Sequence, residues 1–248
     1  MTEKPAGAIF EGLGMFGAAR AAAAPLSLHA EGLPEAHLYY SIGGEDVALL
    51  TRFKRRIRAR KPGIYVDIGG ALPIRWSNTY IFYCYGWSGV AIDANPTRAP
   101  EWARLRPRDR FVAAAAGEGA ARAYLFAHPT NGGMHQISLD PALPGPEFVL
   151  AGTVPMRRLD DVLAESFPGG ASIQFFSIDV EGSELGVLRS NDWERWRPEV
   201  IMMECHDFRF DDPRAAPTVA FLMDQGYRLT AKVGANVMME DTRAAGGA

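Results

Sequence analysis

The sequence predicts an α/β fold, a doubly wound and mostly parallel sheet that ends in a C-terminal antiparallel hairpin. Two short apolar runs, 64–66 and 89–92, each lead to an aspartate, and a longer run at 172–180 is typical of a strand buried on both faces. Predicted strands and helices alternate along the chain, which is the pattern of a parallel sheet. Two further strand segments joined through Gly234 predict the closing hairpin.

Composition favours a single domain over 39–243, because 248 residues can bury one substantial core. A formal net charge of −3 with 22% charged residues gives no reason to expect a nucleic-acid partner. Cys84 and Cys205 lie in apolar runs, so we interpret them as core residues in a reducing cytoplasm rather than as a disulfide. No apolar stretch reaches about 18 residues, so we expect no membrane span.

Residues 1–38 are rich in alanine and interrupted by glycine and proline, and they predict an N-terminal arm. Two interpretations stay open for this arm: a loosely helical segment that packs on another subunit of a homo-oligomer, and plain disorder. The last residues, 244–248, should be frayed.

An amphipathic helix should follow the arm. Val47, Leu50, Phe53 and Ile57 recur at helical spacing and predict the face that packs on the core. The opposite face is basic over 52–61. We interpret it as a solvated face with favourable charge at the helix C-terminus, and a nucleic-acid or membrane surface is the alternative.

The chain is organised around a βαβ unit over 63–96. Its first strand ends at Asp67 and the pair Gly69 and Gly70, and its second strand ends at Asp93. Small residues at the first turn and an acid at the end of the next strand are typical of a nucleoside-cofactor site. The glycine pattern of dinucleotide folds is incomplete here, which favours a ligand without phosphates.

The remaining elements complete the alternation. We expect helices over 98–105, 156–167, 185–188 and 218–224, and strands over 111–116, 123–127, 172–180, 200–203, 227–232 and 236–239.

The segments YVDIGG, SNTYIFYCYGW, AIDANP and SIDVEGSELGVLRSNDWERWRP resemble the FkbM family of S-adenosylmethionine-dependent methyltransferases over roughly 40–239. The resemblance implies a Rossmann-like class I methyltransferase fold, S-adenosylmethionine as cofactor, and O-methylation of a sugar or natural-product scaffold. Two positions depart from the family pattern: Leu72 stands where Asn or His is common, and Asp93 stands where Glu is frequent.

The nine residues that we expect to bind the cofactor are Asp67, Gly69, Gly70, Asn78, Thr79, Asp93, Ala94, Ala115 and Asp179. Asp93 should accept hydrogen bonds from the ribose hydroxyls, and the small Ala115 should lie near the base. Asn78 and Thr79 begin a helix whose N-terminus could hold a carboxylate, with an ordinary helix cap as the alternative.

For an alcohol acceptor, the protein must remove a proton, and the candidate bases are His206, Asp179 and Glu181 at two strand ends. Packing for His206 and helix capping for Glu181 are the alternatives. A divalent metal held by Asp179, Glu181, Glu204 and His206 is a further alternative, although the spacing does not demand one.

The irregular stretch 127–152 is interpreted as a lid over a small hydroxylated acceptor, with His128 and His135 as secondary contacts. Two other functions are kept as alternatives. A nicotinamide-dependent reductase is disfavoured by the missing third glycine and by the absence of a Tyr-x-x-x-Lys pair. A non-catalytic partner-binding domain on the same fold is the other.

Overall fold

The computed structural model describes residues 39–119, 121–129 and 135–243. The predicted arm 1–38 and tail 244–248 lie outside the described residues. Within them, no helix is long and apolar enough to cross a membrane. Cys84 and Cys205 are both free thiols, and Cys205 is buried.

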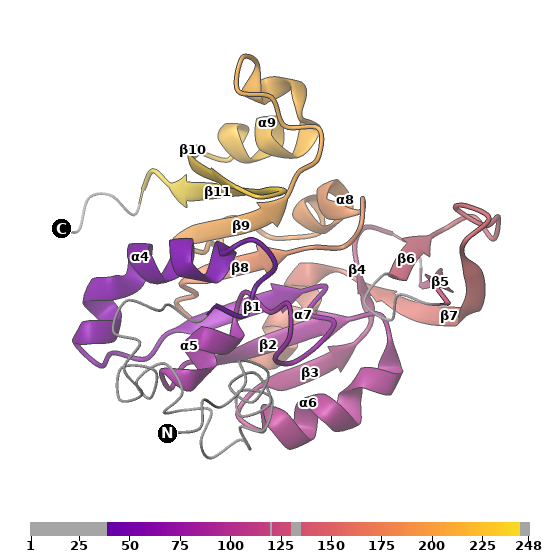
Figure 1. Cartoon of the computed structure of the whole chain (residues 1–248), viewed down its shortest axis with the longest axis horizontal. Helices are drawn as coiled ribbons and strands as arrows, with labels where there is room; N and C mark the ends of the chain where they lie inside the picture. Colours follow the sequence, from indigo (N-terminus) through magenta and orange to yellow (C-terminus); the bar gives the residue numbers. More distant parts are fainter. Residues whose placement is uncertain (1–38, 120, 130–134, 244–248) are drawn as a thin grey trace, which may run out of the picture.

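The core is a seven-stranded sheet in the order β10-β11-β9-β8-β1-β2-β3 (Figure 1). Its strands are β1 (Ile64–Ile68), β2 (Ser88–Asp93), β3 (Arg110–Ala113), β8 (Phe175–Ile178), β9 (Val200–Glu204), β10 (Tyr227–Val233) and β11 (Asn236–Asp241). Neighbouring strands from β3 to β9 are parallel, whereas β11 runs antiparallel to both β9 and β10. The predicted doubly wound sheet with a C-terminal hairpin is confirmed.

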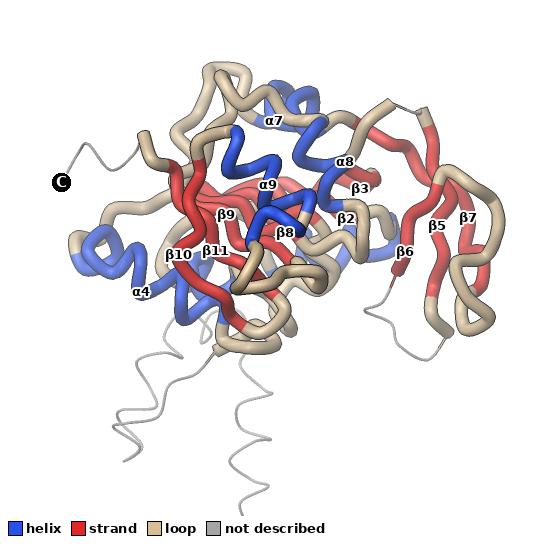
Figure 2. Tube along the Cα trace, turned by 90° about the horizontal axis from the view of Figure 1, so that it is seen from above, coloured by secondary structure: helices blue, strands red, loops and turns tan. Residues whose placement is uncertain are grey.

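Helices cover both faces of this sheet (Figures 1 and 2). The helical segments are α4 (Glu45–Arg58), α5 (Tyr80–Cys84), η1 (Pro96–Arg98), α6 (Ala99–Leu105), α7 (Leu159–Ser166), α8 (Glu184–Arg189), η2 (Pro213–Ala215) and α9 (Pro217–Asp224). Alternate residues of β1, β8, β9 and β11 enter two separate core clusters. Phe176 packs with α7, α8 and α9, and its neighbour Phe175 packs with α4 and α5, as the two-residue period of a strand requires.

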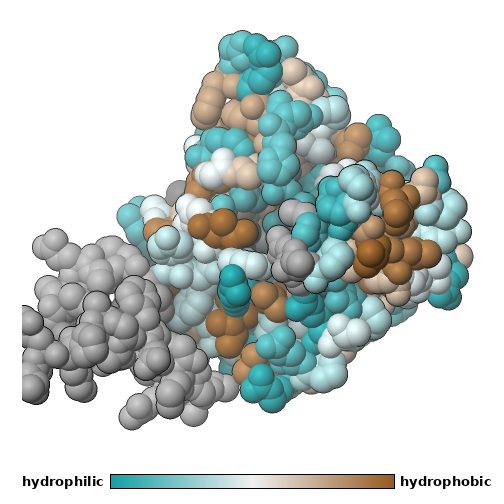
Figure 3. Space-filling view, turned by 45° about the vertical axis from the view of Figure 1, so that its right-hand side comes forward, coloured by the Kyte–Doolittle hydropathy of each residue, from teal (hydrophilic) through white to brown (hydrophobic). Residues whose placement is uncertain are grey.

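A second, four-stranded sheet in the order β4-β7-β5-β6 projects from one side of the molecule (Figure 2). Its strands are β4 (Ala115–Ala116), β5 (Arg122–Ala127), β6 (His135–Ser138) and β7 (Val149–Arg157). Apolar residues gather over this side in Figure 3, and the exposed large apolar residues of the β6–β7 region are Leu139, Leu143, Val149 and Leu150.

This second sheet corrects three predictions. The single strand expected over 111–116 is divided at Ala114, because β3 pairs with β2 and β4 pairs with β7. The stretch 127–152 is not irregular throughout, since β6 and the start of β7 lie in it. The helix expected from residue 156 starts only at Leu159, because Met156 and Arg157 pair with β4 and stay extended.

Helix α4 buries a face different from the predicted one. Phe53 is buried as expected, but Leu49 is also buried and Val47 is 36% exposed. The helix is rotated because its two first-turn acids turn inward: Asp46 accepts the Ser41 hydroxyl at 2.7 Å, and Glu45 accepts the Asn236 amide of β11 at 3.1 Å.

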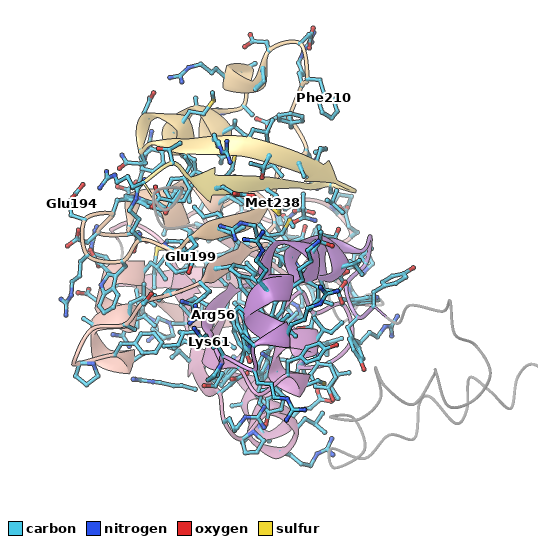
Figure 4. The ribbon with its side chains drawn as sticks, turned by 90° about the vertical axis from the view of Figure 1, so that its left-hand side faces the viewer. Arg56, Lys61, Glu194, Glu199, Phe210 and Met238 are labelled. Carbon is cyan, nitrogen blue, oxygen red and sulfur yellow. The ribbon has the colours of Figure 1, made fainter. Side chains whose placement is uncertain are left out.

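The basic face of α4 is partly bound by acids of the same chain. Arg52 lies 3.2 Å from Glu240 and 3.9 Å from Glu199. Figure 4 labels Arg56, Lys61 and Glu199 on the side of the molecule that carries α4. These pairs favour the interpretation of a solvated face.

Arg106, which follows α6, is fully buried and holds the long loop between β1 and α5 in place. Its Nε donates to Asp109 Oδ2 at 2.6 Å. The remaining donors reach four more acceptors: Pro73 O, Ser77 Oγ, Tyr65 Oη and Thr79 Oγ1. All five N–H groups of the guanidinium therefore have acceptors. The expected polar surface helix over 98–105 thus ends in a core contact, and Trp102 within it is also buried.

Replacing Arg106 by Met should lower the free energy of unfolding by about 3–5 kcal/mol, because the change leaves the Asp109 carboxylate buried without its cation. Urea denaturation monitored by circular dichroism measures the loss. The exposed Arg104 of α6 supplies the matched control, and Arg104→Met should shift stability by no more than about 0.5 kcal/mol. Equal effects of the two substitutions would contradict the structural role of Arg106.

Candidate active site

A cavity of about 300 Å³ lies at the carboxyl ends of β1, β2 and β8. The chain order reverses here, because β1 has β2 on one side and β8 on the other. Ligands of open α/β sheets bind at such a switch point. The volume is at the lower end of the range for small-molecule sites.

Gly69 allows the close contact between β1 and β8 that shapes the cavity floor. Its φ is +82°, and a Cβ built on it would lie 1.6 Å from the carbonyl oxygen of Asp179. Its N–H donates to Ile92 O of β2 at 2.8 Å. The glycine predicted at this turn is thus required by the approach of a neighbouring strand, and it connects three strands at the cavity.

Asp93 lines the cavity at the end of β2, as predicted. Its Oδ2 accepts the Ala71 N–H at 2.9 Å, and its Oδ1 accepts the Asn95 N–H at 2.8 Å. Burial raises the pKa of Asp93, and these two hydrogen bonds oppose the rise. Each oxygen keeps a second lone pair, so the carboxylate can still accept hydrogen bonds from a ligand.

Asp67 lines the cavity at the end of β1 and is held from behind. It is 5% exposed, and its Oδ2 accepts the Thr79 hydroxyl at 2.5 Å. Thr79 accepts in turn from Arg106 at 2.9 Å. Burial raises the pKa of Asp67, and the charge of Arg106 opposes it.

Thr79 does not have the predicted place at the cavity. Its side chain is fully buried behind Asp67 and is not part of the cavity wall. Asn78 does line the cavity and donates to Ser177 Oγ at 3.0 Å. The first N–H groups of α5 point to Ser77 Oγ, which accepts from Thr79 and Tyr80. Thr79 is the N-cap residue of α5 and makes no side-chain cap hydrogen bond, so the start of the helix is held by Ser77 instead.

Asp179 and Glu181 line the cavity at the end of β8, and their environment is acidic. Burial, together with the nearby charges of Glu204 and Glu181, raises the pKa of Asp179 to about 8. Burial and Glu204 also raise the pKa of Glu181. Glu181 is not the cap of α8, because the N-cap residue is Ser183, which makes no side-chain cap hydrogen bond. Glu184, the first residue of α8, accepts the N–H groups of Val180 and Gly182 in the preceding loop.

His206 is not placed at the cavity. Its side chain is 75% exposed, and its Nε2 lies 3.1 Å from Glu204 Oε1. Cys205 turns inward and is buried after β9 ends, so the next side chain points outward. Strand β9 therefore brings Glu204 toward Asp179 but leaves the predicted histidine base outside the cavity wall.

The metal alternative is not supported by the geometry. Within the described ranges, no group of three or more histidine, cysteine, aspartate or glutamate residues is arranged to hold a metal ion.

The small sheet contributes one further wall. His135 and Ile137 of β6 line the cavity, together with Ala115 of β4. His135 Nε2 lies 3.2 Å from the side-chain amide of Asn95. His128 instead packs edge-on against Phe148, with ring centroids 5.8 Å apart.

Some of the cavity residues were missed by the sequence reasoning. Ile42 and Trp76 line it and are 70% and 40% exposed. Trp76 has a φ of +61°, and Ala71 and Glu181 also have positive φ. Such strained residues are typical of functional sites. Only the proximity of Trp76 to the SNT segment could have indicated it from sequence.

The described sheet is doubly wound, with an acidic cavity at the point where the strand order reverses. The chain belongs to the FkbM methyltransferase family, since the family's methyltransferase FkbM domain matches residues 67–229. S-adenosylmethionine is the cofactor, and the protein is an S-adenosylmethionine-dependent methyltransferase. This membership argues against a nicotinamide-dependent reductase.

Several solved structures are similar to the chain in fold. The structure of monomeric WbdD matches with a TM-score of 0.42 and 11% identity over 79% of this chain, which spans 40% of that chain. The 1,6-didemethyltoxoflavin-N1-methyltransferase of Burkholderia thailandensis, solved with its substrate and S-adenosylhomocysteine, gives a TM-score of 0.40 and 14% identity over 80% of this chain and 76% of its own.

The precorrin-6y C5,15-methyltransferase of Geobacter metallireducens gives a TM-score of 0.38 and 13% identity over 77% of this chain and 85% of its own. No curated protein matches the chain.

The raised carboxyl pKa values predict that stability falls as the pH rises. A carboxyl with a raised folded pKa binds more protons in the folded than in the unfolded state. Its contribution is complete below about pH 4 and is lost as the pH rises through its folded pKa, which for Asp179 is about 8. The melting temperature should fall by about 4 °C or more from about pH 5.5 to about pH 8.5. Asp179→Asn should flatten this slope, whereas Asp211→Asn at an exposed site should not; equal slopes in both would contradict the assignment.

Proposed function

We propose that the protein transfers the methyl group of S-adenosylmethionine to a hydroxyl of a small molecule, a sugar or a natural-product scaffold. The observation that carries this proposal is the carboxyl group of Asp179, which lies at the cavity with its pKa raised to about 8. An alcohol must lose a proton as it accepts a methyl group. A general base is most effective when its pKa lies near the working pH.

The residues present fit the cofactor. Asp93 keeps lone pairs for the ribose hydroxyls, and Ala94 and Ala115 leave room for a flat base. Asp67, with the Gly69 and Gly70 turn, suits the methionine end. When bound, S-adenosylmethionine supplies an electrophilic methyl group on a cationic sulfur.

Within this arrangement, Asp179 takes the proton of the acceptor hydroxyl, and Glu181 orients the acceptor beside it. The side chains of Ile42, Trp76 and Ile137 form an apolar part of the wall where the acceptor would lie. Excluding water there strengthens the electrostatic interactions at the cavity.

The proposed partner and location rest on the cavity residues and on the two cysteines. Among the described residues that line the cavity, none is lysine or arginine, which supports a small neutral or cationic acceptor over a polyanion. The free thiols of Cys84 and Cys205 support a cytoplasmic location. A homo-oligomer through 1–38 stays a proposal.

The first test is a calorimetric titration with S-adenosylhomocysteine, run beside NAD⁺ and NADPH. One-site binding of the thioether alone is expected. Transfer of a ¹³C-labelled methyl group to a panel of alcohols and amines then identifies the acceptor atom from the product's carbon spectrum. Labelling of amines only would overturn the proposal of O-methylation.

Replacing Asp93 by Ala should weaken binding of S-adenosylhomocysteine by about 1.5–3 kcal/mol, because hydrogen bonds from ribose hydroxyls to a carboxylate are lost. The same calorimetric titration measures the change. Asp211→Ala, at an exposed carboxylate, serves as the control. Unchanged affinity in the Asp93 variant would refute the ribose assignment.

Replacing Asp179 by Asn should lower kcat by about 10²–10⁴-fold, because the amide cannot take the acceptor's proton. The neutral thioether should still bind to this variant. The pH profile of kcat gives a second measure: the rise of kcat with pH should disappear in the variant. A profile identical to that of the unmodified protein would show that another group is the base.

A further inference from the structure

The negative charges around the cavity are compensated unevenly. Asp93 has two backbone N–H donors and the nearby charges of Arg98 and His135. Asp67 has the Thr79 hydroxyl and, behind it, Arg106. The carboxylates at the ends of β1 and β2 therefore have hydrogen-bond donors or cations that offset their charge.

Acids from several neighbouring elements act on Asp179. Glu204 acts on it from β9, Glu181 from the following loop, Glu184 from α8 and Asp67 from β1. His206 is mostly exposed and pairs with Glu204 rather than with Asp179. Its charge acts on Glu181. One oxygen of Glu204, Oε2, is buried without a hydrogen-bond partner in the described structure.

Asp179 also lies beside the turn at Gly69 and Gly70, where we propose that the cofactor binds. The carbonyl oxygen of Asp179 packs directly against Gly69, at a distance that leaves no room for a Cβ. A ligand seated on this turn is thus within the reach of the charges at the end of β8. S-adenosylmethionine and its product differ by one methyl group and one unit of positive charge.

We propose that Asp179, supported by Glu181 and Glu204, senses the charge of the bound ligand: the group holds a proton beside the neutral thioether and releases it when the cationic sulfonium binds. The inference rests on the proposed place of the cofactor and the base, but not on the identity of the acceptor. It makes Asp179 a residue that selects cofactor over product.

The electrostatic effect is large enough for this role. An opposite charge within about 4–6 Å lowers the pKa of a carboxyl by about 1–3, a change of 10- to 1,000-fold in its proton affinity. A carboxyl raised to about 8 by burial and by four acids would then ionise near neutral pH. Ligand selectivity follows, because proton release coupled to binding makes affinity depend on pH.

A proton affinity of Asp179 that depends on the charge of the ligand also suits methyl transfer to a hydroxyl. As the oxygen–methyl bond forms and the sulfur–methyl bond breaks, the acceptor's O–H proton passes to the Asp179 carboxylate. The site then lacks the positive charge that had kept Asp179 ionised. Asp179 therefore keeps the proton, and the attraction between its carboxylate and a cationic sulfur is absent while the thioether occupies the site.

The experiment is isothermal titration calorimetry of the full chain in two or more buffers of different ionisation enthalpy, with a chelator and no acceptor. The dependence of the observed enthalpy on the buffer gives the number of protons released. S-adenosylmethionine should release about half a proton or more near pH 7, and S-adenosylhomocysteine clearly less. The ratio of the two affinities should rise with pH, by at most about tenfold per pH unit.

Variants then identify the carboxyl group that releases the proton. Asp179→Asn should remove the difference between the two ligands, Glu181→Gln should reduce it, and the exposed control Asp211→Asn should retain it. Equal proton release with both ligands would overturn the inference while leaving O-methylation intact. A difference that persists in Asp179→Asn would also overturn it. Failure of either ligand to bind would refute the inference together with the proposed cofactor site.

Discussion

The buried guanidinium of Arg106 is the interaction on which the active site depends. It lies between the first strand, the loop that follows this strand, and the end of α6, and each of its N–H groups has an acceptor. A buried charge of this kind is tolerated only with such complete pairing. Because Thr79 connects it to Asp67, a contact in the core sets the position of a carboxylate at the cavity.

The second constraint is the contact between β1 and β8 at Gly69. It brings the ends of two strands so close that the acids following them share one small volume. Repulsion and burial raise the pKa values of Asp179 and Glu181, which costs folding stability at neutral pH. Positive φ at Ala71, Trp76 and Glu181 adds strain along the same rim. The rest of the sheet, with its two apolar clusters, stabilises this arrangement.

The two sheets have different roles. The seven-stranded sheet provides the acids and the glycine turn, whereas the small sheet adds His135 and Ile137 to the opposite wall. Ala115 belongs to β4, where the chain leaves the large sheet for the small one. The proposed adenine position is therefore adjacent to the element that would contact the acceptor. Variation in the small sheet could change the acceptor without disturbing the cofactor residues.

The sequence by itself determined the strands of the large sheet and the residues at their ends, because buried parallel strands need continuous apolar runs that stop at polar residues. Asp67, Asp93 and Asp179 were found in this way. The tertiary structure decided which of these groups face one another, and it placed Thr79 behind the wall and His206 outside it. The tertiary structure also paired Arg106 with Asp109 in a segment that the sequence pattern indicated as surface. Part of the small sheet lies in the stretch 127–152, which has no regular hydrophobic period. These outcomes depend on contacts between residues far apart in the chain, which local patterns do not encode.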